Sequence, residues 1–438
     1  MTSDRGTKAS TFVSQDGSFF NHQGDKLRTL RRAVVTGLGA ITPLGLDAES
    51  FWQGLLAGRS GAGPITLFDA TDFPSRIAVE VKGFDPCRYM DHKMVRRSGR
   101  FAQFGTAAAR QALESAGLAV DESTRDQIGI VMASSGGLAG LGPQERILEE
   151  RGPGRIDPLL ISRVGAHMAG VRIGHVLGVR GPNTTINSAC ASGADAIGHA
   201  LNLIRLGQAD VLLAGGCEAT VAPLTMAAMA IVGALSRRND DPQGASRPFD
   251  AERDGFVMGE GAGVLVLESE EHARRRNAPV LAEVAGAGWS FDAVDETAPD
   301  VEGQAQAMAS ALRDAGVATA DIDYISAHGT STQLNDKTET AAIKKVFGDL
   351  AYRTPVSSIK SMIGHLVAAA GAVEAVAAVL TLRDQILPPT INYRTPDPEC
   401  DLDYVANEAR PHRVSVCLSD SFGLGGQNAC LVLRRYDA

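Results

Sequence analysis

Short runs of apolar and β-branched residues recur along the chain and predict strands, because each run is bounded by glycine, proline or polar residues. In chain order these runs are "RAVVTGLGA" (32–40), "DQIGIVMASS" (126–135), "NTTINSA" (183–189), "ADVLLAGG" (209–216), "AGVLVLES" (262–269), "VLAEVAGAGWS" (280–290), "DYISAHG" (323–329), "TPVSSIKS" (354–361), "HRVSVCLSDSFG" (412–423) and "NACLVLRRY" (428–436).

Between these runs the apolar positions follow a helical period. After Cys190 they fall at Ala194, Ile197, Leu201 and Ile204, at spacings of three and four residues. This helix is expected over 191–206, with Gly207 as its cap. Four further helices are expected over 97–116, around 308–316, near 337–347 and over 366–384.

Strands that alternate with helices predict an α/β fold with a parallel or mixed sheet. The pattern restarts near residue 280, which predicts two similar halves, 32–280 and 281–438. Residues 1–31 are polar and lack the apolar core of a signal peptide, so we expect a poorly ordered extension there.

The composition limits the classes of function. The 438 residues carry a net charge of −9, which argues against a general binder of nucleic acid or of anionic membranes. No apolar run reaches the roughly 18 uncharged residues of a membrane helix. The six cysteines show no metal-ligand spacing, so we expect a reduced, cytoplasmic protein without a metal or other cofactor.

One cysteine occupies a position suited to catalysis. Cys190 lies where a strand ends and a helix begins, and unpaired N–H groups at a helix start favour an anion. The sequence therefore predicts a thiol with a lowered pKa, which would act as a nucleophile. A buried structural cysteine is the alternative interpretation.

Two histidines and a lysine occupy similar strand-to-helix turns. His328 follows "DYISA", Lys360 is expected to end a strand, and His365 is expected to open the Ala-rich helix. Each histidine alone could be a structural residue. Together with Cys190 the set suits thioester chemistry, in which two neutral imidazoles polarise a carbonyl and the Lys360 charge lowers their pKa values.

Five stretches, "INSACASG", "SRPFDAERDGFVMGEGAGVLVLE", "AHGTSTQLNDKTE", "KSMIGHLVAAAGAVE" and "SFGLGGQNA", resemble the β-ketoacyl-[acyl carrier protein] synthases of the synthase II type. The likeness covers about residues 32–437. It implies a thiolase-like fold of two βαβαβ halves in five αβαβα layers, and a homodimer. The implied activity is an acyltransferase that performs decarboxylative Claisen condensation of an acyl group on Cys190 with malonyl-acyl carrier protein in fatty-acid elongation.

The resemblance also implies residue roles. His328 and His365 would bind and decarboxylate the malonyl thioester, Lys360 would support them, and the backbone amides of Cys190 and Leu424 would form the oxyanion hole. The remaining implied residues are Thr330, Thr332 and Phe422 at the substrate and pantetheine site, and the supporting acids Asp336, Glu339 and Glu374, which would hold the Lys360 loop and the sheet ends.

The sequence departs from the family pattern at the acyl pocket. Leu424 replaces the phenylalanine that usually gates it, and Gly136 and Gly137 fall near a usual isoleucine. Both changes predict a wider pocket that tolerates long or bulky primers, while neutral drift is the alternative.

Lys93, Arg96 and Arg97 share one face of a helix and could dock an acidic carrier protein, with a solvated charged face as the alternative. Three other functions are alternatives to elongation. A thiolase would need a second catalytic cysteine after residue 281, and a chain-length factor would lack Cys190. A ketosynthase subunit of a type II polyketide or specialised lipid pathway, with or without a partner chain, stays open.

Overall fold

The computed structural model describes residues 12–13, 18–20 and 26–437. Most of the predicted extension over 1–31 lies outside the described residues. Its described parts form a small antiparallel sheet of β1 (Phe12–Val13), β2 (Ser18–Phe20) and β3 (Lys26–Thr29).

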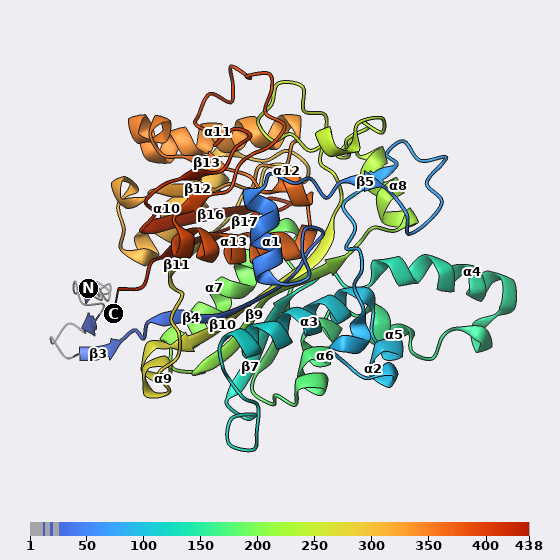
Figure 1. Ribbon diagram of the computed structural model, residues 1–438, viewed down its shortest axis with the longest axis horizontal. Coiled ribbons are helices and arrows are strands. Elements are labelled where there is room, and N and C mark those ends of the chain that lie inside the picture. The colour runs from blue at the N-terminus through green and yellow to red at the C-terminus, as the bar shows by residue number, and fades with distance from the viewer. Residues whose placement is uncertain (1–11, 14–17, 21–25, 438) are drawn as a thin grey trace, which may run out of the picture.

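All ten predicted strands are present, and they form one mixed sheet (Figure 1). The first five are β4 (Ala33–Ile41), β7 (Ile128–Ala133), β8 (Asn183–Ile186), β9 (Val211–Ala219) and β10 (Glu260–Ser269). The last five are β11 (Ala282–Phe291), β12 (Tyr324–Ser326), β13 (Val356–Ser357), β16 (Val416–Phe422) and β17 (Gln427–Arg434).

The order of strands in the sheet is the evidence for two similar halves. It runs β13-β12-β16-β17-β11-β4-β10-β9-β7-β8, so each half repeats the same order outward from its first strand. Within each half the pairs of the second strand are parallel and the others antiparallel. The halves meet where β11 pairs with β4, as at Ala282 and Val35. The predicted boundary at 280/281 falls between α9 (Glu270–Arg275) and β11.

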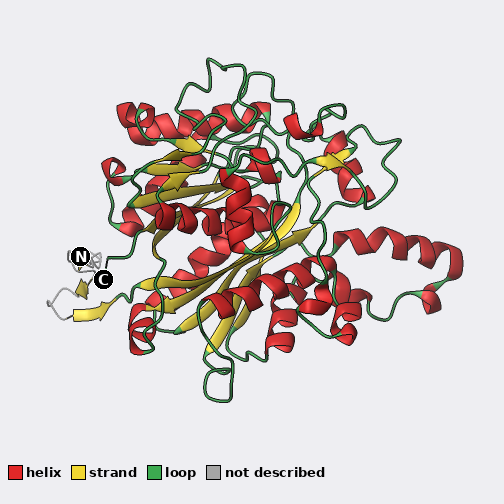
Figure 2. Ribbon diagram, viewed as in Figure 1, coloured by secondary structure: helices red, strands yellow, loops and turns green. Residues whose placement is uncertain are grey.

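Helices on both sides of each half complete five layers (Figure 2). Outer helices α3 (Arg100–Ser115) and α6 (Met168–Leu177) pack on the first half, and α10 (Val301–Ala315) and α11 (Gln333–Phe347) cover the second. The central layer consists of α7 (Ser192–Arg205) and α13 (Ala370–Asp384), which contact each other and strands of both halves. The thiolase-like α/β fold is therefore confirmed.

Helix α13 is buried on all sides, which explains its composition, whereas α7 exposes His199. Every residue of α13 from 370 to 382 is buried, so its sequence is apolar all round instead of showing one stripe. The two helices cross at Gly193 and Gly371. A Cβ atom on Gly193 would lie 2.5 Å from the backbone nitrogen of Ala372, so the crossing requires glycine.

The remaining helices and strands connect these layers. They are α1 (Ala48–Leu56), α2 (His92–Arg97), α4 (Leu141–Arg151), α5 (Leu160–Val164), α8 (Pro223–Ile231), α12 (Lys360–Ile363), β5 (Gly63–Pro64), β6 (Ile77–Ala78), β14 (Ile386–Leu387) and β15 (Arg410–Pro411). Short 3-10 turns are η1 (Pro86–Arg88), η2 (Leu138–Gly140), η3 (Pro153–Arg155), η4 (Ala189–Ala191), η5 (Pro242–Gly244), η6 (Thr319–Asp321), η7 (Gly348–Tyr352) and η8 (Val367–Ala369).

The helix expected over 97–116 is α3, which begins only at Arg100 because Ser98 and Gly99 adopt extended backbone after the end of α2. Helices α4 and α5 extend to one side of the molecule in Figure 1. Among the described residues, no helix combines the length and the apolar character needed to cross a membrane.

Candidate active site

Cys190 lies in the turn η4 between the end of β8 and the start of α7, as the sequence predicts. The turn is strained, since Ala189 has a φ of +52°, which a residue with a side chain rarely adopts. Local hydrogen bonds hold it: the Ser188 N–H donates to Ser192 Oγ at 2.8 Å, and that hydroxyl donates to the Ala189 carbonyl at 2.6 Å. The thiol therefore has a fixed position at the beginning of α7.

The expected lowering of the Cys190 pKa is wrong. Burial raises the pKa of this thiol above its usual value, while the backbone N–H of Leu424 and the Lys360 charge act in the opposite direction. The buried acids Glu374 and Glu218 add to the rise. The sequence could not predict this result, because the desolvation comes from residues of both halves.

The backbone N–H of Leu424 lies near the Cys190 sulfur and acts to lower the pKa of that thiol. Leu424 belongs to the glycine-rich turn between β16 and β17, and its side chain is half exposed. An amide at this position can also stabilise the oxyanion of a carbonyl that the sulfur attacks. The oxyanion-hole role of the Leu424 amide stays a prediction.

His328 follows β12, and two buried acids on α11 hold its loop. Glu339 accepts the backbone N–H groups of His328 and Gly329, each at 2.7 Å, and burial raises the Glu339 pKa to about 8. Asp336 accepts the N–H groups of Thr330 and Ser331 at 3.0 and 3.1 Å. The expectation that both acids hold the Lys360 loop is therefore wrong, because α11 lies beneath the His328 loop instead.

Lys360 opens the short helix α12 and does not end a strand, since β13 already ends at Ser357. Its ammonium group is buried and forms an ion pair with Glu374 on α13. It also donates to the His328 carbonyl at 2.7 Å and lies 3.4 Å from Nδ1 of the same histidine. Glu374 is thus the one predicted supporting acid that contacts Lys360.

His365 lies between α12 and η8, two residues before the first turn that leads into α13, so it does not open that helix directly. Its backbone N–H donates to the Val257 carbonyl at 2.8 Å, and its carbonyl accepts from Gly259 at 2.9 Å. Its ring meets the His328 ring edge to face, with 5.4 Å between centroids. Phe256, which the sequence analysis did not single out, packs edge-on against His365 at 5.2 Å.

Both histidines are neutral in this environment. Burial lowers the pKa of each ring well below its usual value, and the Lys360 charge lowers both further. Nδ1 of His365 accepts the Val367 N–H at 3.3 Å, and Nδ1 of His328 faces the Lys360 ammonium. A neutral imidazole has a single N–H, so in both rings Nε2 carries the proton and serves as a hydrogen-bond donor.

These side chains share one cavity of about 340 Å³. Its lining includes seven of the predicted residues, namely Cys190, His328, Thr330, Thr332, His365, Phe422 and Leu424. The hydroxyls of Thr330 and Thr332 lie 2.9 Å apart, and the Phe422 ring packs edge-on against His328. The cavity can therefore hold a thioester between a nucleophile and two hydrogen-bond donors.

The sequence predicts a wider acyl pocket at Gly136, and the physical reason for that prediction is wrong. Gly136 is absent from the lining of this cavity, and its φ is +85°. A Cβ atom there would lie 2.5 Å from the Val164 carbonyl, so backbone and not open space occupies the volume of the missing side chain. A wider pocket cannot be derived from Gly136 and Gly137.

The basic residues Lys93, Arg96 and Arg97 are exposed on α2, away from the lining of the cavity. Arg163 donates to the Arg96 carbonyl at 2.9 Å, and Arg172 donates to the Arg97 carbonyl at 2.8 Å. These contacts fix the end of α2, and the Arg172 guanidinium is itself buried. In the described part of the chain, no group of three His, Cys, Asp or Glu side chains could hold a metal ion.

The chain matches the family models "Beta-ketoacyl synthase, N-terminal domain" over residues 30–273 and "Beta-ketoacyl synthase, C-terminal domain" over residues 281–394. It is 48% identical to the 3-oxoacyl-[acyl-carrier-protein] synthase 2 of Synechocystis sp., with 93% of this chain and 98% of that protein covered.

Two solved structures are also similar. The ishigamide ketosynthase/chain length factor has a TM-score of 0.87 and 40% identity over 93% of this chain and all of that one. A type II PKS ketosynthase, solved with its acyl-carrier protein and bound to the hexaketide, has a TM-score of 0.83 and 36% identity over the same shares.

Proposed function

The chain belongs to the β-ketoacyl synthase family, and we propose that Cys190, His328, Lys360 and His365 form its active site. The protein is a condensing acyltransferase that joins an acyl group to a malonyl unit with loss of CO₂, the elongation step of fatty-acid synthesis. The observation that carries the assignment of residues is the single cavity in which the Cys190 thiol faces two neutral histidines.

The first step is transfer of the acyl group to Cys190. The sulfur attacks the carbonyl of an acyl thioester, and the N–H groups of Cys190 and Leu424 stabilise the oxyanion that forms. The new S–C bond replaces the old one, and the thiol proton leaves with the departing thiol. Because burial raises the pKa of Cys190, this proton is present in the resting enzyme and need not come from solvent.

The second step is decarboxylation of the malonyl thioester. The bond to the carboxylate breaks, CO₂ leaves, and its electron pair forms an enolate whose oxygen accepts hydrogen bonds from Nε2–H of His328 and His365. The enolate carbon then attacks the acyl carbonyl on Cys190. A carbon–carbon bond forms, and the Cys190 thiolate leaves and takes up a proton.

Lys360 is the positioning residue of this proposal. Its ammonium fixes the His328 ring through Nδ1 and lowers the pKa of both histidines, which stay neutral donors. Glu374 neutralises the buried charge, and Asp336 and Glu339 fix the backbone that carries His328.

The proposed partner is an acyl carrier protein that brings both thioesters. The exposed side chains Lys93, Arg96 and Arg97 suit an acidic partner on a protein of net charge −9. Thr330 and Thr332 lie at the cavity and would contact the pantetheine arm. One similar structure holds a ketosynthase with its acyl-carrier protein. We place this reaction in the cytoplasm, where the six unpaired cysteines would stay reduced.

We also propose a homodimer. Among the described residues, strand β8 is the last strand of the sheet and pairs with β7 alone. Nearby segments α4 and α5 carry exposed apolar side chains at Leu141, Leu148 and Ile161, a surface that a second copy would bury. Light scattering of the Leu148→Glu variant should show a monomer if this surface is the interface.

Intact-protein mass spectrometry tests the proposed function. Wild type and Cys190→Ala are incubated with acyl-carrier thioesters of graded length, followed by malonyl-carrier thioester. We expect an acyl adduct on wild type alone, and a 3-oxoacyl product two carbons longer. Repeated condensation without reduction would instead favour the polyketide pathway, and no adduct with any primer would refute the role of Cys190.

A further inference from the structure

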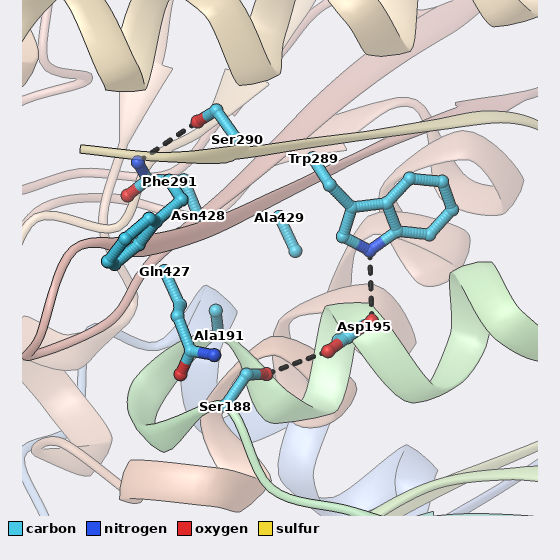
Figure 3. A pocket seen from close by; sticks show the side chains of 9 residues that line it. All are labelled: Ser188, Ala191, Asp195, Trp289, Ser290, Phe291, Gln427, Asn428 and Ala429. Carbon is cyan, nitrogen blue, oxygen red and sulfur yellow. Dashed lines mark hydrogen bonds between the residues drawn. The ribbon is translucent and has the colours of Figure 1, made fainter. Parts of the chain in front are cut away.

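A chain of hydrogen bonds outside the proposed catalytic set ties the turn of Cys190 to the other half of the molecule (Figure 3). The Ser188 hydroxyl donates to one oxygen of Asp195 at 2.9 Å. The indole N–H of Trp289, on β11, donates to the other oxygen at 2.9 Å. Both carboxylate oxygens are therefore used, one by each half.

The neighbourhood of this chain is built for close contact. Figure 3 shows Asp195 on α7 between Ser188 and Trp289, at the side of a hollow of about 320 Å³. The indole rests on Gly198 of α7, where a Cβ atom would lie 2.6 Å from its ring carbon Cζ2. The absence of a side chain at Gly198 thus lets Trp289 approach the helix and reach Asp195.

The turn needs such an anchor for two reasons. Ala189 holds a left-handed backbone, which is unfavourable for a residue with a side chain and persists only where surrounding contacts enforce it. Moreover, Cys190 comes from the first half, whereas His328 and His365 come from the second. The distance between nucleophile and donors therefore depends on contacts that cross between the halves.

We propose that Asp195 is a positioning residue for Cys190, which it holds in register with the second half through Ser188 and Trp289. The inference rests on the proposed function for its meaning in catalysis. On this proposal, loss of the Asp195 side chain loosens the turn and slows reactions at the Cys190 sulfur. The positions of His328 and His365 stay unchanged.

The variants Asp195→Ala and Asp195→Asn separate positioning from charge. Alanine removes both hydrogen bonds. Asparagine keeps them, because its carbonyl accepts from Trp289 and its amide donates to the Ser188 hydroxyl, which can also accept. The matched control is Asp314→Ala, since Asp314 binds Arg205 at the far end of α7 at 2.6 Å and also links the two halves.

Two half-reactions are measured on each protein. The first is single-turnover acylation of Cys190, followed by intact mass. The second is decarboxylation of malonyl-carrier thioester without a primer. We expect Asp195→Ala to slow acylation about tenfold, the loss of two hydrogen bonds, with decarboxylation near the wild-type rate. Asp195→Asn should restore acylation, and Asp314→Ala should leave both rates unchanged.

Equal rates of Cys190 acylation in Asp195→Ala and Asp314→Ala would overturn the proposal. An Asp195→Ala variant that slows acylation and decarboxylation by the same factor would also overturn it. If wild type accepts no acyl group, the proposed function fails instead. The rate of Cys190 alkylation by chloroacetamide, read on the Cys190 peptide, then still decides the positioning role, because an unchanged rate in Asp195→Ala refutes it.

Discussion

The buried carboxyl group of Asp420 should make the protein less stable as the pH rises. Asp420 lies on β16 with no exposed surface, and neither of its oxygens has a normal hydrogen bond within the described residues. Burial raises its pKa to about 7, with a smaller contribution from the Glu374 charge, while the weakly donating Cys430 thiol opposes the shift. The ordinary value is 3.8.

The sign follows from proton binding. Between pH 3.8 and about 7 the unfolded chain has lost the Asp420 proton and the folded chain keeps it, so stability falls as the pH rises through this window. The whole effect is about 4 kcal/mol, at 1.36 kcal/mol for each pH unit. Asparagine has a similar shape and no titrating proton, so Asp420→Asn does not lose this stability as the pH rises.

The assay compares urea unfolding of wild type and Asp420→Asn at pH 5 and pH 8, at one protein concentration. The free energy of unfolding of Asp420→Asn minus that of wild type should be larger at pH 8 than at pH 5 by roughly 2–3 kcal/mol. The difference is smaller than the whole effect because wild type has already lost part of its stability below pH 5. Buried acids that Asp420 does not influence titrate alike in both proteins and cancel in the difference. Glu339 does not cancel, because the Asp420 charge raises its pKa in the wild type alone. Asp121→Asn is the control, because exposed hydrogen bonds from Ser123 lower the pKa of Asp121. An equal advantage at both pH values would refute the reasoning.

Four further predictions concern the active site and the central helices. Lys360→Met should lower the free energy of unfolding by about 3–5 kcal/mol because Glu374 is left buried and unpaired, and pairing it with Glu374→Gln should recover part of this loss in urea melts. In the pH–rate profile of malonyl decarboxylation, Lys360→Met should move the acid limb to higher pH, because the pKa values of His328 and His365 rise. An unmoved acid limb would contradict this prediction. Gly193→Ala should lower the free energy of unfolding by about 1–3 kcal/mol, because the added Cβ meets α13 at the helix crossing. Gly142 has open space around it, so Gly142→Ala should not destabilise the protein in the same melts. Leu424→Phe keeps the backbone amide but fills the mouth of the cavity, so acylation by long primers should slow more than acylation by short ones; equal rates would show that this side chain has no gating role.

The sequence by itself determined the elements and the identity of the chemical groups. Strand and helix periods depend on the spacing of neighbouring side chains, so the ten strands and the positions of α7 and α10 could be predicted locally. The same holds for Cys190 at the start of a helix and for His328 after a strand. A local signal fails where tertiary contacts end an element, as at Lys360, which opens a helix because β13 is only two residues long.

Only the tertiary structure decided which groups meet and what burial does to them. Trp289 and Asp195 are 94 positions apart, and no local pattern connects them. Burial by both halves raises the pKa of Cys190, against the expectation from its helix start. Backbone from 164–166 fills the space beside Gly136 that the sequence suggested was open. Desolvation and packing are sums over residues that the sheet order brings together, and that order is a property of the whole fold.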